Sequence, residues 1–286
     1  MLVRVIPRLD IKGPNLVKGV MLEGLRVLGK PEAFARRYYE AGADELLFVD
    51  VVASLYGRNS LSDIVARTAR DVFIPLTVAG GIRSLDDIHT ALRAGADKVA
   101  INTAAHQRPD LIREASRKYG ASTVVVSIEA IKHSDGRYEA YTDNGRERTG
   151  RDAIAWAEQM AEAGAGELLV TSIDREGTGR GYDLELLTKI IDRVGIPVVA
   201  SGGAGTVEHV VDAINVTGAA AVASVLHYDL LPTLRNDPTA FDPSINLSHL
   251  QRPGFARIAP APLSDIKRQL DRHGHTSRPS PEAIHV

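Results

Sequence analysis

Two halves of this chain repeat each other at a constant spacing, and this repeat restricts the fold more than any other feature of the sequence. The segment GADELLFVD at 42–50 resembles GAGELLVTS at 164–172, and PLTVAGGIRSLDDI at 75–88 resembles PVVASGGAGTVEHV at 197–210. In both matches the second copy starts 122 residues after the first. Similarity at a single offset indicates a fold assembled from two related units in tandem.

Short β-branched runs alternate with helical patterns in both halves. The expected strands are 3–9, 46–51, 74–79, 97–101, 123–128, 167–172, 196–200 and 220–224. The expected helices lie near 31–41, 60–71, 85–94, 107–119, 151–163, 183–193 and 206–216. The strand runs are almost wholly apolar, as parallel strands are when helices cover the sheet. This alternation predicts a single α/β domain, a (β/α)8 TIM barrel built from two tandem half-barrels. A doubly wound open sheet fits the alternation too, but the repeat argues against it.

The barrel accounts for only part of the chain. We expect the barrel core at 1–228, a proline-containing insertion on the catalytic face at 229–262, the final barrel helix at 263–274 and a disordered tail at 275–286.

The composition excludes several classes of function. A net charge of −2 gives no electrostatic case for nucleic acid or an anionic membrane as partner. No stretch approaches the ~20 apolar residues of a membrane-spanning helix. Cysteine is absent and the nine histidines are scattered, so we expect no disulfide, no metal site and no cofactor, and a cytoplasmic location.

A carboxylate ends each of two equivalent strands. The buried run VVVSIEA at 124–130 leads into Glu129, and the repeat aligns LDIKG at 9–13 with IEAIK at 128–132. Asp10 and Glu129 should therefore face each other across the mouth formed by the carboxyl ends of the strands, where this fold places its catalytic residues. Stability alone explains such a pair poorly, and we interpret it as catalytic.

Paired glycines follow two other equivalent strands. AGG at 79–81 and SGG at 201–203 each precede a helix, so backbone N–H groups can approach a phosphate closely. INTAA at 101–105 and ASVLH at 223–227 add hydroxyl and N–H groups at the next strand ends. Two such sites predict a substrate with a phosphate at each end.

Seven segments together resemble a known family. They are RVIPRLDIKGPNLVKGV, GADELLFVD, PLTVAGGIRS, AGADKVAINTAA, YTDNGRERTG, TSIDREGTGRGYDLEL and IPVVASGGAG, in order between about residues 3 and 228. They are similar to the cyclase subunit of imidazole glycerol phosphate synthase, a HisF-like (β/α)8 barrel. The resemblance implies a lyase that takes ammonia from a glutaminase partner and reacts it with a bis-phosphorylated ribulosyl intermediate of histidine biosynthesis. The products would be imidazole glycerol phosphate and aminoimidazole carboxamide ribotide.

The resemblance also implies roles for individual residues. Asp10 and Glu129 would be the catalytic acid and base, and Lys18 would be a mobile-loop lysine near the substrate. The other implied substrate contacts are Asp50, Gly80, Gly81, Asn102, Thr103, Thr171, Glu176, Gly202, Gly203 and Ser224. On the opposite face, Arg4, Glu45, Lys98 and Glu167 match a gate to an ammonia passage, and Asp97 matches a residue that docks the glutaminase. From the residues alone, those four charges would be a salt-bridged plug.

Three residues depart from the family pattern. Glu129 and Glu176 stand where the family usually has Asp, and Arg8 replaces a small residue, usually Cys. The extra methylene moves a carboxylate by about 1 Å, and a misplacement of that size can cost about a hundredfold in rate. We therefore expect Glu129 to perform the cyclase reaction poorly unless the backbone or substrate shifts to match it. Arg8 should pair with an acid or fill space near the mouth or passage.

Two other functions stay open. The chain could keep the barrel and the passage but deliver ammonia for another amidotransfer, such as one in nucleotide-sugar biosynthesis. It could also be the sister aldose–ketose isomerase of the histidine pathway, although the VKGV and TSIDREGT stretches resemble the cyclase.

Overall fold

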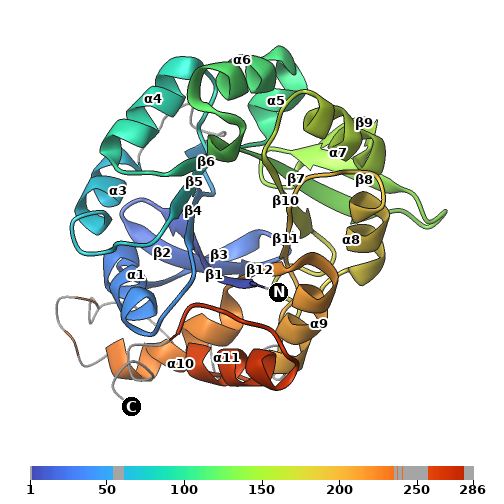
Figure 1. The fold of residues 1–286 in the computed structure, drawn as a ribbon. Coiled ribbons are helices and arrows are strands. Elements are labelled where there is room, and N and C mark those ends of the chain that lie inside the picture. The colour runs from blue at the N-terminus through green and yellow to red at the C-terminus, as the bar shows by residue number, and fades with distance from the viewer. Residues whose placement is uncertain (1, 54–60, 235–236, 238–239, 241–256, 280–286) are drawn as a thin grey trace.

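Eight parallel strands close into a barrel in the computed structural model, which describes residues 2–53, 61–234, 237, 240 and 257–279 (Figure 1). Around the barrel they are β1 (Arg4–Lys12), β4 (Leu46–Asp50), β5 (Leu76–Ala79), β6 (Lys98–Ile101), β7 (Val124–Lys132), β10 (Glu167–Ser172), β11 (Val198–Ser201) and β12 (Ala219–Val222). The pairings of β7 with β10 and of β12 with β1 join the two halves and leave no open edge. The predicted TIM barrel is confirmed.

Helices surround the barrel and bury their apolar faces against it. They are α1 (Pro31–Glu40), α3 (Ser62–Thr68), α4 (Leu85–Ala94), α5 (Thr103–Gln107), α6 (Asp110–Tyr119), α7 (Ala153–Glu162), α8 (Leu184–Ile191), α9 (Val207–Thr217), α10 (Ser224–Leu234) and α11 (Leu263–Arg272), with a 3-10 turn at Ala121–Thr123. The repeat extends to the way in which helices begin. Ser84 caps α4 and Thr206 caps α9, each by accepting a bond from a backbone N–H three residues later, and the two caps are 122 residues apart.

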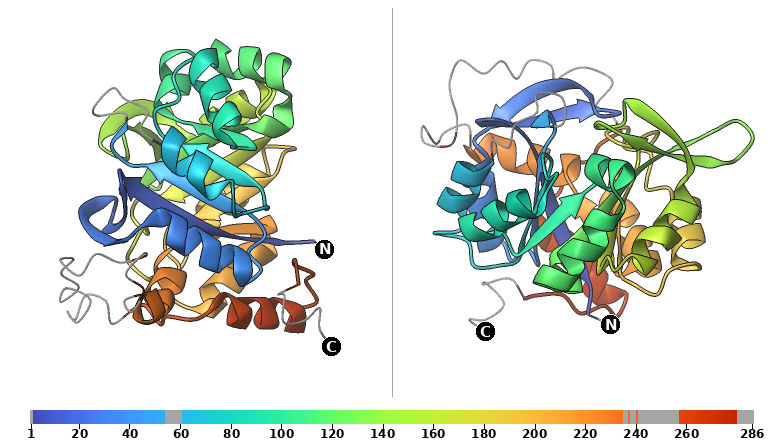
Figure 2. Two further views of the ribbon diagram at one scale, coloured as in Figure 1. Left: turned by 90° about the vertical axis from the view of Figure 1, so that its left-hand side faces the viewer. Right: turned by 90° about the horizontal axis from the view of Figure 1, so that it is seen from above.

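Two hairpins that the sequence analysis did not predict extend equivalent strands. β2 (Asn15–Val20) and β3 (Glu23–Gly29) follow β1, while β8 (Tyr138–Thr142) and β9 (Glu147–Asp152) follow β7. Their tips carry two pairs of residues with left-handed backbone, Met21–Leu22 and Asp143–Asn144, again 122 apart. Both hairpins stand at the end of the barrel away from the N-terminus (Figure 2). The repeat therefore includes a hairpin in each half.

The strand register supports the equivalence of the two acids. Asp10 lies beside Val49 in the β1–β4 pair, and Glu129 lies beside Thr171 in the β7–β10 pair. Val49 and Thr171 are themselves 122 residues apart. The acids are only 119 apart because the turn at 133–137 is three residues longer than its counterpart at 13–14.

The core has two parts. A large cluster fills the space between the strands and the outer helices, and a smaller one, including Ile6, Leu47, Val125, Leu169 and Val199, fills the barrel interior. Alternate residues of a strand point to the same side. Along β1 these inward residues are Arg4, Ile6, Arg8 and Asp10, which follow one another from the lower opening to the mouth.

The last part of the chain differs in detail from the expected segments. The range expected as an insertion at 229–262 begins inside α10, which continues to Leu234 with Pro232 in its last turn. Residues 241–256 lie outside the described part, and 257–262 run beside the barrel, with Ala259 donating to Gly205 O at 2.7 Å. The final helix is α11.

The expected tail at 275–286 is described up to residue 279. This part lies along the N-terminus: Thr276 pairs with Leu2, and the backbone N–H of Arg278 donates to Asp44 Oδ1 at 2.7 Å. The prediction of disorder thus does not fit 275–279, because the backbone of these residues bonds Val3 and the Asp44 side chain, which the sequence pattern did not indicate. Residues 280–286 lie outside the described residues. Among the residues that the structure describes, no helix has the length and apolarity needed to cross a membrane.

Candidate functional site

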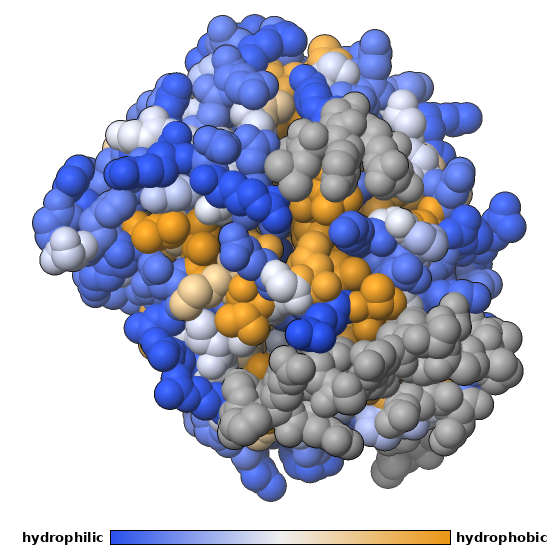
Figure 3. All heavy atoms as spheres, turned by 180° about the vertical axis from the view of Figure 1, so that it is seen from behind, coloured by the Kyte–Doolittle hydropathy of each residue, from blue (hydrophilic) through white to orange (hydrophobic). Residues whose placement is uncertain are grey.

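The two hairpins border the mouth of the barrel. Their tips touch, since Asn144 Nδ2 donates to Leu22 O at 3.3 Å, and Leu22 packs with Tyr141 and Ile173 in a small apolar cluster. Figure 3 looks onto this face and shows hydrophobic residues across its middle, with hydrophilic residues around them. The two halves of the barrel are therefore in contact at the mouth through their hairpin tips.

Glu129 is held by the β8–β9 hairpin. Its Oε2 accepts a bond from the backbone N–H of Gly145 at 2.8 Å, and Gly145 has a φ of 75°, a backbone conformation that favours glycine. The side chain is partly exposed to the mouth, yet the surrounding protein replaces most of its water. This burial raises the pKa of Glu129 to about 7, against the opposing effects of Arg8 and the Gly145 bond. The hairpin backbone thus fits a glutamate at this position.

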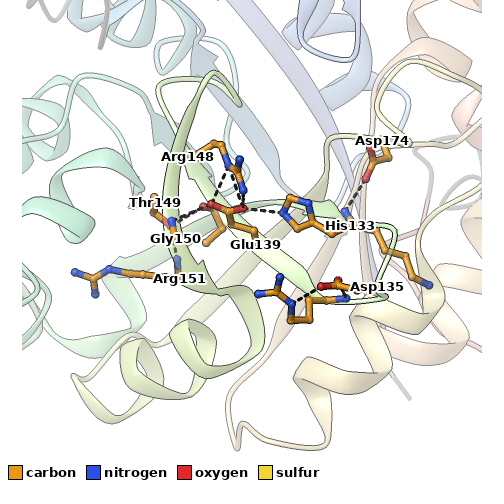
Figure 4. Close-up of polar contacts among 11 residues, drawn as sticks. His133, Asp135, Glu139, Arg148, Thr149, Gly150, Arg151 and Asp174 are labelled. Atoms are coloured by element: carbon orange, nitrogen blue, oxygen red, sulfur yellow. Dashed lines mark hydrogen bonds and ion pairs between the residues drawn. The ribbon is translucent and has the colours of Figure 1, made fainter.

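A second glutamate, Glu139, joins the two strands of the same hairpin near its base (Figure 4). We call Glu139 and its partners Arg148, Gly150 and His133 the clasp. Glu139 binds Arg148 Nη2 at 2.8 Å, His133 Nε2 at 2.7 Å and the backbone N–H of Gly150 at 2.9 Å. The bond from Arg148 is the main cause that lowers the pKa of Glu139 to about 2. Because Glu139 joins both strands of the hairpin and the turn before it, the clasp helps to position Gly145.

The first glycine site opens into a cavity. A space of about 270 Å³ lies among the ends of β4, β5, β6 and β7, beside Glu129. Its lining includes the predicted residues Asp50, Gly80, Gly81, Asn102 and Thr103. Gly80 and Gly81 have φ values of 92° and 76°. The Oδ1 of Asn102 is buried without a hydrogen-bond partner among the described residues, so an acceptor for a ligand N–H or O–H group remains available at this site.

The second glycine site is filled by side chains. Arg8 crosses the barrel interior and donates to Asp10 Oδ1 at 2.8 Å, to Ser201 Oγ at 3.0 Å and to Thr171 Oγ1 at 3.3 Å. Small residues of β12 and the loop after it, Ala221 and Ala223, line the space beside it and leave room for the guanidinium.

Lys18 and Glu176 form a buried ion pair next to Arg8. Lys18 lies on strand β2 rather than on the loop that the resemblance implied, and its Nζ donates to Glu176 and lies 4.0 Å from Asp10 Oδ2. Burial lowers the pKa of Lys18, but Glu176 and Asp10 outweigh that effect and raise it. The pKa of Glu176 is lowered, since Lys18 and Arg8 outweigh its burial. Only about 10 Å³ stays free here, beside Gly202, Gly203 and Ser224.

The four charged residues at the lower opening form a closed ring. Arg4 bonds Glu45 at 2.8 Å and also bonds Glu167, while Lys98 reaches Glu45 at 3.2 Å and Glu167 at 3.0 Å. Each cation thus contacts both glutamates. Inside the ring, a space of about 20 Å³ lies among Ile6, Leu47, Thr77 and their neighbours, enough for one water-sized molecule.

The outer side of the ring is hollowed. A concavity of about 500 Å³ is lined by residues that include Leu2, Arg4, Lys98 and Glu167. Leu2 is 75% exposed, and Asp97 is exposed at the same end of the barrel. One oxygen of Asp97 accepts from the backbone N–H of Leu76 at 2.8 Å, so this side chain also fixes the start of β5.

The structure brings together most residues that the sequence singled out, in three groups. Asp50, Gly80, Gly81, Asn102, Thr103 and Glu129 share the open cavity; Asp10, Lys18, Thr171, Glu176, Gly202, Gly203 and Ser224 surround the filled site; and Arg4, Glu45, Lys98 and Glu167 form the ring. Sequence reasoning missed the contributions of Gly145, of Ser201 and of Asp143, which also lines the open cavity. The DNG run at 143–145 is a recognised hairpin signal and could have placed Gly145 near the mouth. In the described part of the chain, no three His, Asp or Glu side chains are grouped to hold a metal ion.

Comparison with known proteins identifies the family of this chain. Residues 4–232 match the family model described as "Histidine biosynthesis protein". The chain belongs to this family. Three of its relatives are named imidazole glycerol phosphate synthase subunit HisF. The protein of Legionella pneumophila is 60% identical over 206 residues, which cover 72% of this chain and 97% of the relative. That of Thermosynechococcus vestitus is 53% identical over 236 residues, which cover 80% of this chain and 84% of the relative. That of Exiguobacterium sp. is 50% identical over 224 residues, which cover 78% of this chain and 88% of the relative.

The HisF resemblance inferred from the sequence motifs is thereby confirmed. As a HisF-like member of the histidine biosynthesis family, the chain combines the expected barrel with an unusual second glycine site. Arg8 pairs with an acid, one of the two outcomes expected for it, and that acid is Asp10 itself.

Proposed function

We propose that this chain is the cyclase subunit of an imidazole glycerol phosphate synthase. It takes ammonia from a glutaminase bound at the lower end of the barrel. It reacts this ammonia with the bis-phosphorylated ribulosyl intermediate and releases imidazole glycerol phosphate and aminoimidazole carboxamide ribotide. The names of its HisF relatives support this activity, and the word "subunit" in those names supports a partner.

The observation that carries the proposal is that one barrel interior connects an ion-paired ring to two carboxylates. On β1 alone, Arg4 belongs to the ring, Ile6 to the apolar interior and Asp10 to the mouth, and Arg8 crosses the interior between Ile6 and Asp10. An apolar interior suits a small neutral molecule such as ammonia better than an ion. In the proposed path, ammonia enters when the ring opens, crosses the interior and meets the substrate beside Glu129.

The two carboxylates differ in their surroundings, as acid–base catalysis requires. Imine formation, ring closure and C–N cleavage each need a proton transfer. Glu129, with a pKa of about 7, can hold a proton at neutral pH and give it to the leaving nitrogen. Asp10 accepts a bond from Arg8 and can accept a proton from the attacking nitrogen once the substrate is in place.

The partner would dock at the concavity around the ring. This surface combines the exposed Leu2 with charged residues, and Asp97 lies exposed at the same end of the barrel. A glutaminase bound there would release ammonia directly onto the ring.

The test uses the purified chain, the ribulosyl substrate and excess ammonium salt, with release of the carboxamide ribotide as the signal. We expect turnover that Asp10→Asn reduces by about a hundredfold or more. Turnover no higher than that of Asp10→Asn would refute the cyclase activity.

The pairing of Arg8 with Asp10 favours a second candidate function. If the pair stays closed, the mouth could not use Asp10, and the barrel would conduct ammonia to another acceptor, such as one in nucleotide-sugar biosynthesis. In that case a complex with the glutaminase would consume glutamine and release ammonia at the mouth without forming the ribotide.

A further inference from the structure

The second glycine site already contains a carboxylate of the chain itself. Glu176 Oε2 lies 3.2 Å from the point where a Cβ atom on Gly202 would stand, and Glu176 is only 4% exposed. The space left beside it is about 10 Å³, compared with about 270 Å³ at the first glycine site. A phosphate group cannot enter this space while Glu176 stays there.

The charges around Glu176 are balanced. Arg8 and Lys18 supply two positive charges, and Asp10 and Glu176 supply two negative ones, all of them buried. A phosphate that added its charge to this group would leave excess negative charge in a site with little water, which is costly. A phosphate that replaced Glu176 would find the same two cations, the glycine backbone and Ser224. The site is thus an anion site whose present occupant is Glu176.

The β2–β3 hairpin holds Glu176 in place. The backbone N–H of Met21 donates to Glu176 O at 2.8 Å, and Lys18 of the same hairpin binds its carboxylate. Gly177 packs so closely under the hairpin that a Cβ atom there would lie 2.6 Å from Gly19 O. Removal of Glu176 from the site therefore requires the hairpin contact to change as well.

We propose that Glu176 sets the phosphate specificity of this mouth by occupying its second phosphate site. This inference rests on the proposed function, which assigns two phosphate sites to the mouth. A ligand binds through the phosphate at Gly80–Gly81. A second phosphate has to exchange with the Glu176 carboxylate at Lys18 and Arg8, so it adds little to the affinity.

The test compares two probes by calorimetry at neutral pH: ribulose 5-phosphate, with one phosphate, and ribulose 1,5-bisphosphate, with two. For the unaltered chain we expect dissociation constants within about threefold of each other. In Glu176→Gln, which keeps the size of the side chain and removes its charge, the bisphosphate should bind about tenfold tighter while the monophosphate is unchanged. Glu185→Gln is the matched control, because Glu185 also pairs with lysines but lies exposed on α8.

A bisphosphate that binds the unaltered chain tenfold tighter than the monophosphate, with no further gain in Glu176→Gln, would overturn the inference. Thermal unfolding of both variants with and without each probe gives an independent measure of the same affinities. If neither probe binds any of the proteins, the phosphate sites of the proposed function are wrong and the inference fails with them. If binding follows the prediction and ammonium-fed turnover is absent, the inference stands and the cyclase proposal falls.

Discussion

Glu129 reaches the mouth with a side chain one methylene longer than that of Asp10, and the backbone around it is arranged to hold it. The backbone N–H of Gly145 donates to the carboxylate of this longer side chain at 2.8 Å. The expectation that Glu129 is badly placed therefore has a physical counter-argument: the hairpin presents its N–H where the glutamate oxygen lies. The position of the Glu129 carboxylate thus depends on the β8–β9 hairpin as well as on β7, the strand that carries the residue.

If Glu129 is the general acid, its protonation should control the rate. We expect kcat/KM, measured at a constant concentration of free ammonia, to fall as the pH rises through about 7, because the raised pKa leaves the carboxyl protonated only below that value. Glu129→Gln should lower kcat by about a hundredfold or more and remove the inflection. A profile without an inflection between pH 6 and 8, or one that survives the substitution, would contradict this role.

Single residues also mark the limit of what the sequence predicted. Asp10 and Glu129 could be placed opposite each other because the repeat is visible in the sequence. The partner of Arg8 could not be chosen, because its two hydroxyl partners, Thr171 and Ser201, come from strands more than 160 residues away. Such contacts follow from the closure of the barrel, which sequence spacing alone does not specify.

Among the elements, the β8–β9 hairpin has the clearest functional consequence. Glu139, on β8, binds Arg148 and Gly150 on β9 and His133 in the preceding turn, and Gly145 lies at the tip. Glu139 thus holds the hairpin, and the hairpin holds Glu129 through Gly145.

Removal of the clasp should disturb catalysis without emptying the binding site. We expect Glu139→Ala to lower kcat severalfold with little change in KM, and to speed hydrogen exchange across 138–152, because the bonds to Arg148 and Gly150 of β9 and to His133 of the preceding turn are lost. Asp135→Ala is the matched control: Asp135 bonds Arg137 in the neighbouring turn and is exposed. Equal effects of the two substitutions would show that the bonds of Glu139 have no particular role in positioning the hairpin.

The same clasp should depend on pH. Because Glu139 has its pKa lowered to about 2 in the folded chain, its contribution to stability is present above the ordinary glutamate pKa, about 4.3, and is lost as the pH falls toward 2. The unfolding free energy of Glu139→Gln should therefore depend less on pH between about 5 and 2 than that of the unaltered chain. Parallel curves for the two proteins would contradict this assignment.

The elements were predicted unevenly, for physical reasons. The barrel strands stood out because both of their faces are buried and their residues are apolar. The hairpins did not, because β2, β3 and β9 mix charged and glycine residues and are stabilised by contacts with distant loops. The repeat could have identified both hairpins together, since their left-handed residues match at the same offset.

At the level of the whole molecule, the ring and the mouth lie at opposite ends of one interior. Lys98 bridges both glutamates of the ring from one side, as Arg4 does from the other. Lys98→Met should leave the ring with one cation for two glutamates. We expect it to change the ratio of glutamine-driven to ammonium-driven turnover severalfold and to leave the ammonium-driven rate unchanged. Lys189→Met, at an exposed ion pair on α8, serves as the control and should leave the ratio unchanged.

The overall architecture could be predicted best from the sequence. Which side chains fill the sites at the mouth could be predicted least. Eight βα units with an internal repeat permit few topologies, so the barrel, the mouth and the ring follow from the sequence. The filling of the second glycine site depends on three side chains, Arg8, Lys18 and Glu176, that meet only in the folded chain.

The most direct measurement follows nitrogen through the assembled complex of this chain and its glutaminase. The complex receives glutamine labelled with 15N in the side-chain amide, the ribulosyl substrate and an equal concentration of unlabelled ammonium. We expect the imidazole product to carry the 15N label in large excess over its fraction in the solution, because in the proposed path ammonia passes from the ring to Glu129 inside the barrel. A product labelled only to the extent of the ammonium in solution, or glutamine consumption with no imidazole product, would contradict this account.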